Sequence, residues 1–263
     1  IRDSHILCSL IDKRQTVSLP DRSFVQGTAL FEDYGFDVRY RYKDADIIYV
    51  SPSHMTRWGD VMPNKRRIEL TKYSAANGSL VIEDDYESDF QYNSRPTPSL
   101  YALSGGSNVV YLGSFSRLLL PSIRISFMIL TNELAQKYRQ NIYKFSQTAS
   151  KTEQMALCSF IRDGRLMAQI RKTRRFYTSK TKIFYSILKN KFPDCKIEIS
   201  ENLLQVILHV PFDGDEHTFE KSGIKLYIEK YKSGTITLVL SPGGIQQSKL
   251  ESAADALKKS IGK

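Results

Sequence analysis

The sequence has only three cysteines, a single tryptophan and no long apolar run. Cys8, Cys158 and Cys195 form no Cys-x-x-Cys pair, so the pattern predicts buried free thiols rather than a disulfide framework or a zinc site. No apolar segment approaches the roughly 20 residues that a membrane-spanning helix needs. The first residues do not resemble a signal peptide. We therefore expect a cytoplasmic protein that does not contact a membrane.

Charge is abundant but unevenly distributed. The chain of 263 residues is 41% hydrophobic and 25% charged, which is ordinary for a globular protein with room for two subdomains. The net charge of +10 is concentrated in residues 133–192, which contain 14 Lys or Arg and 3 Asp or Glu. A charge run of this kind is usually a solvated helical face. The alternative is a surface that adds sequence-independent affinity for DNA.

The secondary-structure pattern changes at about residue 133. Before it, short β-rich runs alternate with helical stretches, which is typical of a mostly parallel α/β sheet. A helix is expected over residues 63–77, ended by Asn77-Gly78. The expected strands are 16–19, 46–50, 79–82, 109–112 and 125–130.

After that point the pattern indicates helices and then a small sheet. The expected helices are 133–150 and 152–191, the second interrupted at Asp163-Gly164, and the expected strands are 196–200, 203–210 and 235–240, followed by a helix at 247–261. We therefore expect a large α/β subdomain at residues 1–132. Residues 133–263 should form a helical linker and a small C-terminal α+β subdomain.

Two segments carry the most specific signal, Glu83-Asp-Asp-Tyr86 and Gly113-Ser-Phe-Ser-Arg-Leu-Leu-Leu-Pro-Ser-Ile-Arg124. Both follow expected strands, near the carboxyl edge where open α/β sheets bind ligands. Together they resemble the cofactor-binding core of pyridoxal-phosphate (PLP) enzymes of fold type I, the aspartate aminotransferase fold. They resemble more closely the aminotransferase-like effector domains of MocR/GabR-type transcription regulators. Residues 153–177 also resemble these regulators, and the resemblance spans nearly the whole chain.

The resemblance implies a role for each position. Asp84 matches the aspartate that pairs with the pyridine nitrogen, Tyr86 the tyrosine near the ring oxygen, and Arg124 the arginine that holds the phosphate. The position of the Schiff-base lysine is Arg117. Because a guanidinium stays protonated and delocalised, it cannot condense with the aldehyde. The resemblance therefore implies a former PLP site, with no cofactor and no catalytic residue.

Other positions also depart from the family's pattern. The arginine that binds the substrate carboxylate matches Thr237, and a second family arginine matches Gln26. The family loop Ser-His-Gln-x-Pro-Thr-Gly reads Ser53-His-Met-Thr-Arg-Trp-Gly59 here, and the phosphate loop expected before Ile6 is missing. Losses at several positions indicate natural decay of the site. The alternative is a genuine PLP-dependent aminotransferase with an engineered Lys-to-Arg knockout.

We call the polar residues expected at this sheet edge the vestigial pocket: His54, Asp84, Tyr86, Ser114, Ser116, Arg117 and Arg124. Two interpretations remain open. Asp84 pairs with Arg117 in the space of the former pyridinium, or the pocket still binds a ligand. A metal is not expected, because the Glu83-Asp84-Asp85 run has no His or Cys at ligand spacing.

The resemblance also implies partners. In such regulators an upstream winged-helix domain binds DNA, and we expect that this chain lacks it. We further expect a homodimer and a possible small-molecule effector. The predicted function is that of an effector-sensing and dimerisation domain of a GntR/MocR-family transcription regulator, not an enzyme.

Overall fold

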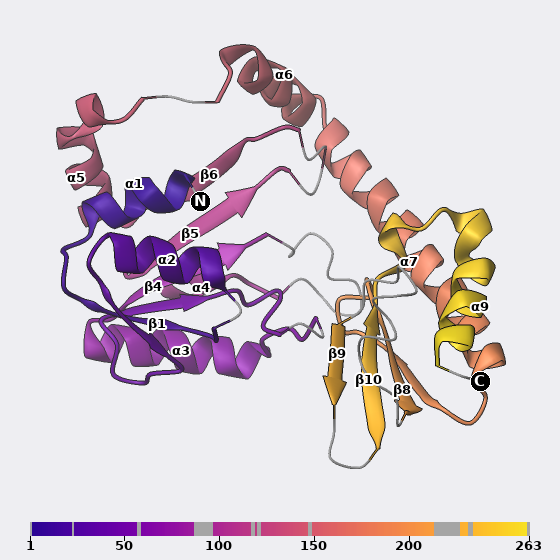
Figure 1. The fold of residues 1–263 in the computed structure, drawn as a ribbon. Helices are drawn as coiled ribbons and strands as arrows, with labels where there is room; N and C mark the ends of the chain where they lie inside the picture. The colour runs from indigo at the N-terminus through magenta and orange to yellow at the C-terminus, as the bar shows by residue number, and fades with distance from the viewer. Residues whose placement is uncertain are drawn as a thin grey trace. The chain divides into compact units, whose positions relative to one another are not determined.

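The computed structural model of the protein describes residues 2–22, 24–56, 59–86, 97–116, 119, 122–146, 149–212, 227–230 and 234–261. Contacts divide the chain into two compact units (Figure 1). The first unit consists of Ile1–Met55, Val61–Asp89 and Pro96–Gln169, and the second of Thr56–Asp60, Phe90–Arg95 and Ile170–Lys263. The boundary between them lies inside one long helix, whereas the composition of the sequence changes near residue 132.

A six-stranded sheet forms the centre of the first unit, in the order β2-β1-β3-β4-β5-β6. All neighbouring pairs are parallel except β5 and β6. Its strands are β1 (Thr16–Leu19), β2 (Asp37–Tyr40), β3 (Ile47–Val50), β4 (Leu80–Asp85), β5 (Val109–Ser114) and β6 (Ser126–Ile129). The five expected strands are confirmed. β2 was not predicted; it is an edge strand of four residues, none of which is buried, so it lacks the apolar run that marks the other strands.

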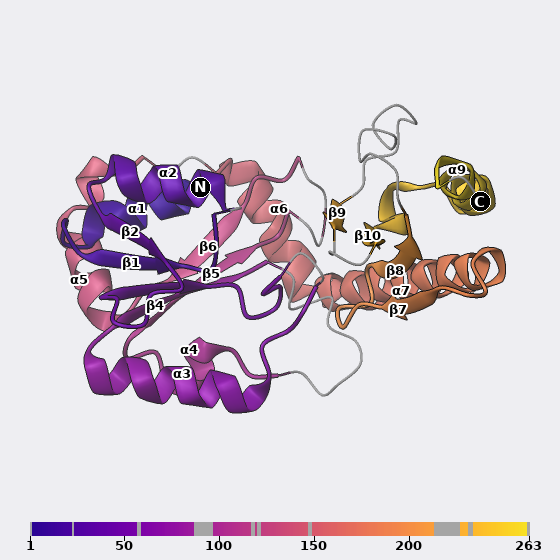
Figure 2. The ribbon, with the colours of Figure 1, turned by 60° about the horizontal axis from the view of Figure 1, so that its bottom comes forward.

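Helices cover both faces of this sheet (Figure 2). The helices α1 (Arg2–Leu10), α2 (Val25–Asp33) and α5 (Asn132–Gln140) lie on one face, and α3 (Asn64–Asn77) and α4 (Leu100–Ser104) on the other. The first face buries the larger core, in which Leu7, Ile47 and Ile82 are almost fully buried. α3 ends as expected, because Gly78 adopts a left-handed φ of 67°.

The prediction of one continuous helix over residues 133–150 was wrong. α5 ends at Gln140, and a short 3₁₀ helix, Ile142–Lys144, follows. The Asn141 side chain donates a hydrogen bond to the Lys137 carbonyl (2.9 Å), so it competes with the helical backbone. The next helix, α6 (Lys151–Arg162), begins after Ser150, whose hydroxyl accepts from the Glu153 N–H. The predicted break before α7 (Arg165–Lys191) is confirmed at Gly164, where φ is 70°.

The second unit contains an antiparallel four-stranded sheet, in the order β7-β8-β10-β9. Its strands are β7 (Lys196–Ile199), β8 (Val206–Pro211), β9 (Tyr227–Lys230) and β10 (Thr235–Leu240). A core formed by the C-terminal half of α7, the strands β8 and β10 and the helix α9 (Leu250–Ser260) includes Leu188, Leu208, Leu238 and Leu250. The expected small α+β arrangement is therefore present, with β9 as a strand that was not predicted.

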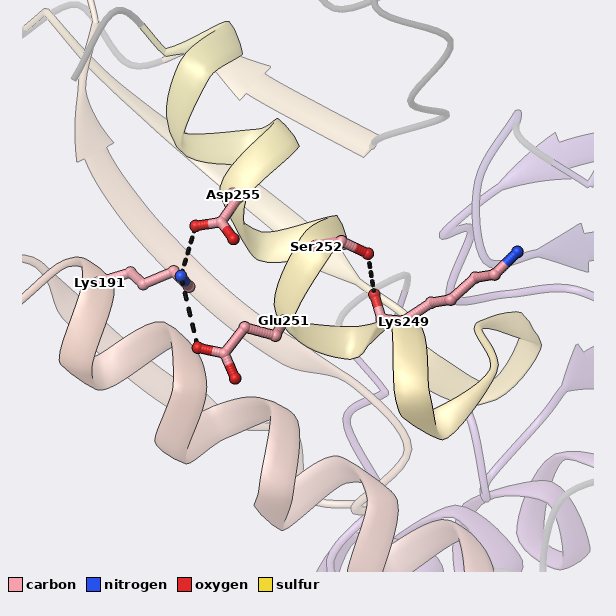
Figure 3. A network of polar contacts seen from close by, with 5 residues as sticks. All are labelled: Lys191, Lys249, Glu251, Ser252 and Asp255. Atoms are coloured by element: carbon pink, nitrogen blue, oxygen red, sulfur yellow. Dashed lines mark hydrogen bonds and ion pairs between the residues drawn. The ribbon is translucent and has the colours of Figure 1, made fainter.

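The last turn of α7 is tied to α9 by charge (Figure 3). The Lys191 ammonium contacts the carboxylates of Asp255 and Glu251, the latter at 3.6 Å. The hydrogen bond that Lys191 donates to Asp255 is the main reason that the pKa of Lys191 is raised. At the start of α9 the Ser252 hydroxyl donates to the Lys249 carbonyl at 3.0 Å. No helix in the described part of the chain is long and apolar enough to cross a membrane.

Candidate functional site

Most of the vestigial pocket lies at one edge of the first sheet. β3, β4 and β5 are parallel, so the residues that follow them, such as His54, Tyr86 and Ser116, share the carboxyl edge. β6 runs the other way, with Ser126 opposite Ser114, which places Arg124 at the same edge just before β6. Arg117 lies outside the described residues, so its pairing with Asp84 stays a prediction.

Asp84 is held by an aromatic residue that the sequence did not single out. The Tyr49 hydroxyl on β3 donates a hydrogen bond to Asp84 Oδ2. The Phe24 ring stacks on Tyr49, with centroids 4.9 Å apart. Gly27 makes this possible, since a Cβ there would lie 1.8 Å from the Phe24 ring. A buried tyrosine usually has a hydrogen-bond partner, so a tyrosine within an expected buried strand was the signal in the sequence that could have indicated this contact.

Burial sets the protonation behaviour of this pair. Desolvation raises the pKa of Asp84, although the hydrogen bond from Tyr49 opposes the shift. Desolvation also raises the pKa of Tyr49 well above its ordinary value, and the neighbouring Asp84 charge adds to the shift. The two groups therefore favour a neutral tyrosine that donates to the carboxyl group.

Glu83 points to the opposite face of the sheet, because successive strand residues alternate. Its side chain is fully buried. The two carboxylate oxygens accept the backbone N–H groups of Leu100 and Tyr101, each at 2.9 Å, at the start of α4. Burial raises the pKa of Glu83, while these two hydrogen bonds lower it by less. Glu83 therefore satisfies two N–H groups that the helix itself leaves unpaired.

Asp85 links three elements of the first unit. It accepts hydrogen bonds from the hydroxyls of Ser53, in the loop after β3, and Tyr111, on β5, the latter at 2.7 Å. Nearby, the buried Arg67 guanidinium donates to three backbone carbonyls, those of Met62 (3.0 Å), Pro98 (3.2 Å) and Pro52 (3.3 Å). Burial lowers the pKa of Arg67, and the charges of Glu83 and Asp85 partly offset this.

The remaining pocket residues organise the loops of the edge. The His54 ring lies tilted against Tyr86, with centroids 5.8 Å apart. The Ser116 hydroxyl donates to the Ile123 carbonyl (2.7 Å), and its N–H donates to Ser114 Oγ (3.3 Å). Arg124 is exposed. The described residues of the edge thus present an imidazole, hydroxyls, carboxylates and the exposed Arg124 guanidinium.

The two positions at which the family has substrate-binding arginines lie in different units. Thr237 is fully buried in β10, where its hydroxyl is 3.0 Å from His209 Nδ1. Gln26 is exposed in the first turn of α2. Among the described pocket residues, none has a primary amine, which is the group that a Schiff base needs. The described part of the chain also contains no cluster of three His, Cys, Asp or Glu placed to hold a metal.

No family profile matches the chain, but proteins with named roles are similar to it in sequence. YdeL of Bacillus subtilis, an uncharacterised helix-turn-helix (HTH) transcriptional regulator, is 30% identical over 96% of the chain and 59% of YdeL. MocR of Rhizobium meliloti, a probable rhizopine catabolism regulatory protein, is 30% identical over 59% of the chain and 31% of MocR. The chain is therefore similar in sequence to HTH-type transcriptional regulators, MocR among them. It spans less than two thirds of the length of these relatives.

Solved structures confirm the fold. An archaeal alanine:glyoxylate aminotransferase superimposes with a TM-score of 0.78 over 98% of this chain and 72% of its own, at 18% identity. At 18% identity, this similarity shows a shared fold and nothing about function. The chain therefore combines a fold type I aminotransferase architecture with a sequence related to transcription regulators.

Replacing Glu83 by Gln should destabilise the protein by about 1–3 kcal/mol, because an amide can accept from only one of the two N–H groups. The folded-state pKa of Glu83 is raised. The stability that Glu83 adds relative to Gln is therefore complete below the unfolded-state pKa and falls as pH rises through the folded-state pKa. Denaturant unfolding of both proteins across this pH range measures the difference. A penalty that grows with pH contradicts the assignment.

Replacing Tyr49 by Phe should cost about 1–3 kcal/mol, because the buried Asp84 carboxyl loses its donor while the ring stays in place. The same change at Tyr143, which is 78% exposed, is the matched control and should change stability by less than about 0.5 kcal/mol. Chemical denaturation of the two variants provides the comparison. Equal effects at both positions mean that the Tyr49–Asp84 hydrogen bond contributes nothing.

Proposed function

We propose that this chain is the effector-sensing and dimerisation domain of a GntR/MocR-family transcription regulator, and that it has lost PLP chemistry. The observation that carries the proposal is Arg117, at the position where the aminotransferase pattern has the Schiff-base lysine. DNA binding would come from an HTH domain of the kind that the names of its relatives indicate. A homodimer would place two such domains at a fixed spacing.

The donor set of the vestigial pocket argues against covalently held PLP. A Schiff base needs an amine that can lose its proton, and a guanidinium cannot do so in a protein. The hydroxyl of Thr237 already pairs with His209 in the second sheet, and it has no charge to offer a substrate carboxylate. The residues present therefore do not fit the cofactor, and we assign no catalytic role to any of them.

The same edge supports binding of a small molecule without chemistry. The Asp84 carboxyl, the Tyr86 phenol and the exposed Arg124 guanidinium offer acceptors and donors of both charge types. An effector bound here regulates the domain only if it binds one conformation more tightly than another. The proposed role is therefore a binding-driven shift between conformations of the domain, without turnover.

A PLP-dependent aminotransferase with an engineered lysine-to-arginine change is the second candidate. The aminotransferase fold and the retained Asp84, Tyr86 and Arg124 favour it. It differs from the first candidate in one decisive property. Restoring a single lysine should restore the cofactor link in a disabled enzyme, but not in a pocket that has also lost its other ligand contacts.

The two candidates are separated by an absorbance titration with PLP on the protein and on its Arg117→Lys variant. We expect no aldimine band from either protein, because the surrounding positions have changed as well. If the Arg117→Lys variant shows an aldimine band and the unmodified protein does not, the chain is a disabled enzyme. A band from the unmodified protein, together with transaminase turnover, contradicts the proposal as a whole.

A double-mutant cycle tests whether Arg117 and Asp84 pair with each other in the vestigial pocket. Replacing either residue alone by Ala should destabilise by roughly 2–4 kcal/mol, since it leaves the other charge buried without its partner. Replacing both should cost clearly less than the sum of the two. Unfolding by denaturant measures all four proteins. Strict additivity means that the two side chains do not interact, which leaves Arg117 to an anionic effector.

A further inference from the structure

One face of α7 forms a basic groove in the second unit. Its cavity volume is about 510 Å³. The lining residues recur at helical spacing and therefore share one face, since a helix repeats every 3.6 residues. They are Arg171, Arg174, Arg175, Thr178, Ser179 and Lys182.

The basic side chains of this groove differ from those at the two ends of the helix, which form ion pairs. At the two ends of α7, Arg165 pairs with Asp163 and Lys191 with acids of α9 (Figure 3). Lys180 is buried and donates to the Gly243 carbonyl at 2.9 Å. In contrast, the exposed side chains of Arg171, Arg175 and Lys182 form no ion pair with any acid in the described parts of the chain.

Sequence and structure agree on the sign of this surface. α7 has nine Lys or Arg and no Asp or Glu among its 27 residues. It supplies most of the basic charge of residues 133–192, for which the sequence left open a solvated face or a surface near DNA. The structure adds that three of the basic side chains without an ion pair in the described parts of the chain, Arg171, Arg175 and Lys182, line a hollow together with two hydroxyl groups.

The shape of the groove favours a long polyanion over a compact one. From residue 171 to residue 182 the helix rises about 16 Å, whereas a single phosphate is bound by groups that converge on one point. Along a DNA strand the phosphates recur about every 3.4 Å of helix axis. Arg, Lys, Ser and Thr side chains are the usual donors to the phosphates and sugars of DNA.

We propose that the groove of α7 binds the phosphodiester backbone of duplex DNA, independently of sequence. It would give this domain a DNA contact of its own, besides any HTH domain. This proposal does not depend on whether the chain binds PLP. The absorbance titration tests the loss of PLP chemistry and a DNA-binding measurement tests the groove, so either can fail without the other.

The test is fluorescence anisotropy with a labelled duplex of arbitrary sequence, at several salt concentrations. The protein should bind with a steep salt dependence. The variant Arg171→Ala/Arg175→Ala/Lys182→Ala should bind about tenfold or more weakly, and the slope of log affinity against log salt should fall by about 2–3. Circular dichroism and thermal unfolding check that the variant folds.

The matched control is Lys65→Ala/Arg66→Ala/Lys72→Ala, which removes the same charge from exposed positions of α3. It should keep most of the affinity and the salt slope. Equal weakening by both variants means that net charge alone attracts DNA, and overturns the proposal, as does an unchanged slope in the α7 variant. Displacement of the duplex by inorganic pyrophosphate at micromolar concentration and constant ionic strength overturns it in favour of a compact anion site.

Discussion

The buried carboxylates at the end of β4 are the constraint on which the first unit depends. Glu83 is fully buried between the sheet and α4, and it is tolerated there because two backbone N–H groups point at it. Asp84 is turned to the other face and is held by Tyr49. Asp85 joins the loop after β3 to β5. One run of three acidic residues on β4 thus connects α4, the loop after β3 and the neighbouring strands β3 and β5.

Under the proposed loss of the Schiff-base lysine, this network explains why the architecture of the cofactor site persists. Residues that orient a cofactor in an enzyme are also partners of neighbouring side chains, and burial makes those partnerships costly to break. A change at position 117 removes the Schiff base without removing the partners of Glu83, Asp84 or Asp85. Fold and chemistry are separable in this way because the chemistry depends on few atoms.

The sequence predicted the elements that follow simple local rules. The apolar runs of β1, β3, β4 and β5 and the Asn77-Gly78 end of α3 were recognisable because both faces of the sheet are covered and a glycine ends the helix. The placement of most pocket residues at one sheet edge followed from the same pattern. The edge strand β2 is short and has no buried residue, and the end of α5 at Gln140 is followed by a side-chain hydrogen bond from Asn141; neither feature leaves a mark in the apolar pattern.

The partners of the site residues were beyond sequence reasoning for a different reason. Tyr49 and Arg67 lie far from β4 in sequence, and only the folded sheet brings them next to Asp84 and Glu83. The groove of α7 could be predicted only in part. Its charge was visible in the sequence, but its concentration on one helix face beside two hydroxyls required the structure.

The central claim is that no side chain of this protein holds PLP as a Schiff base. The most direct measurement is the intact mass of the protein after incubation with stoichiometric PLP and reduction with borohydride, followed by peptide mapping. The account predicts an unmodified protein, apart from scattered trace labelling of surface lysines. One pyridoxyl group per chain, on a single lysine, contradicts it.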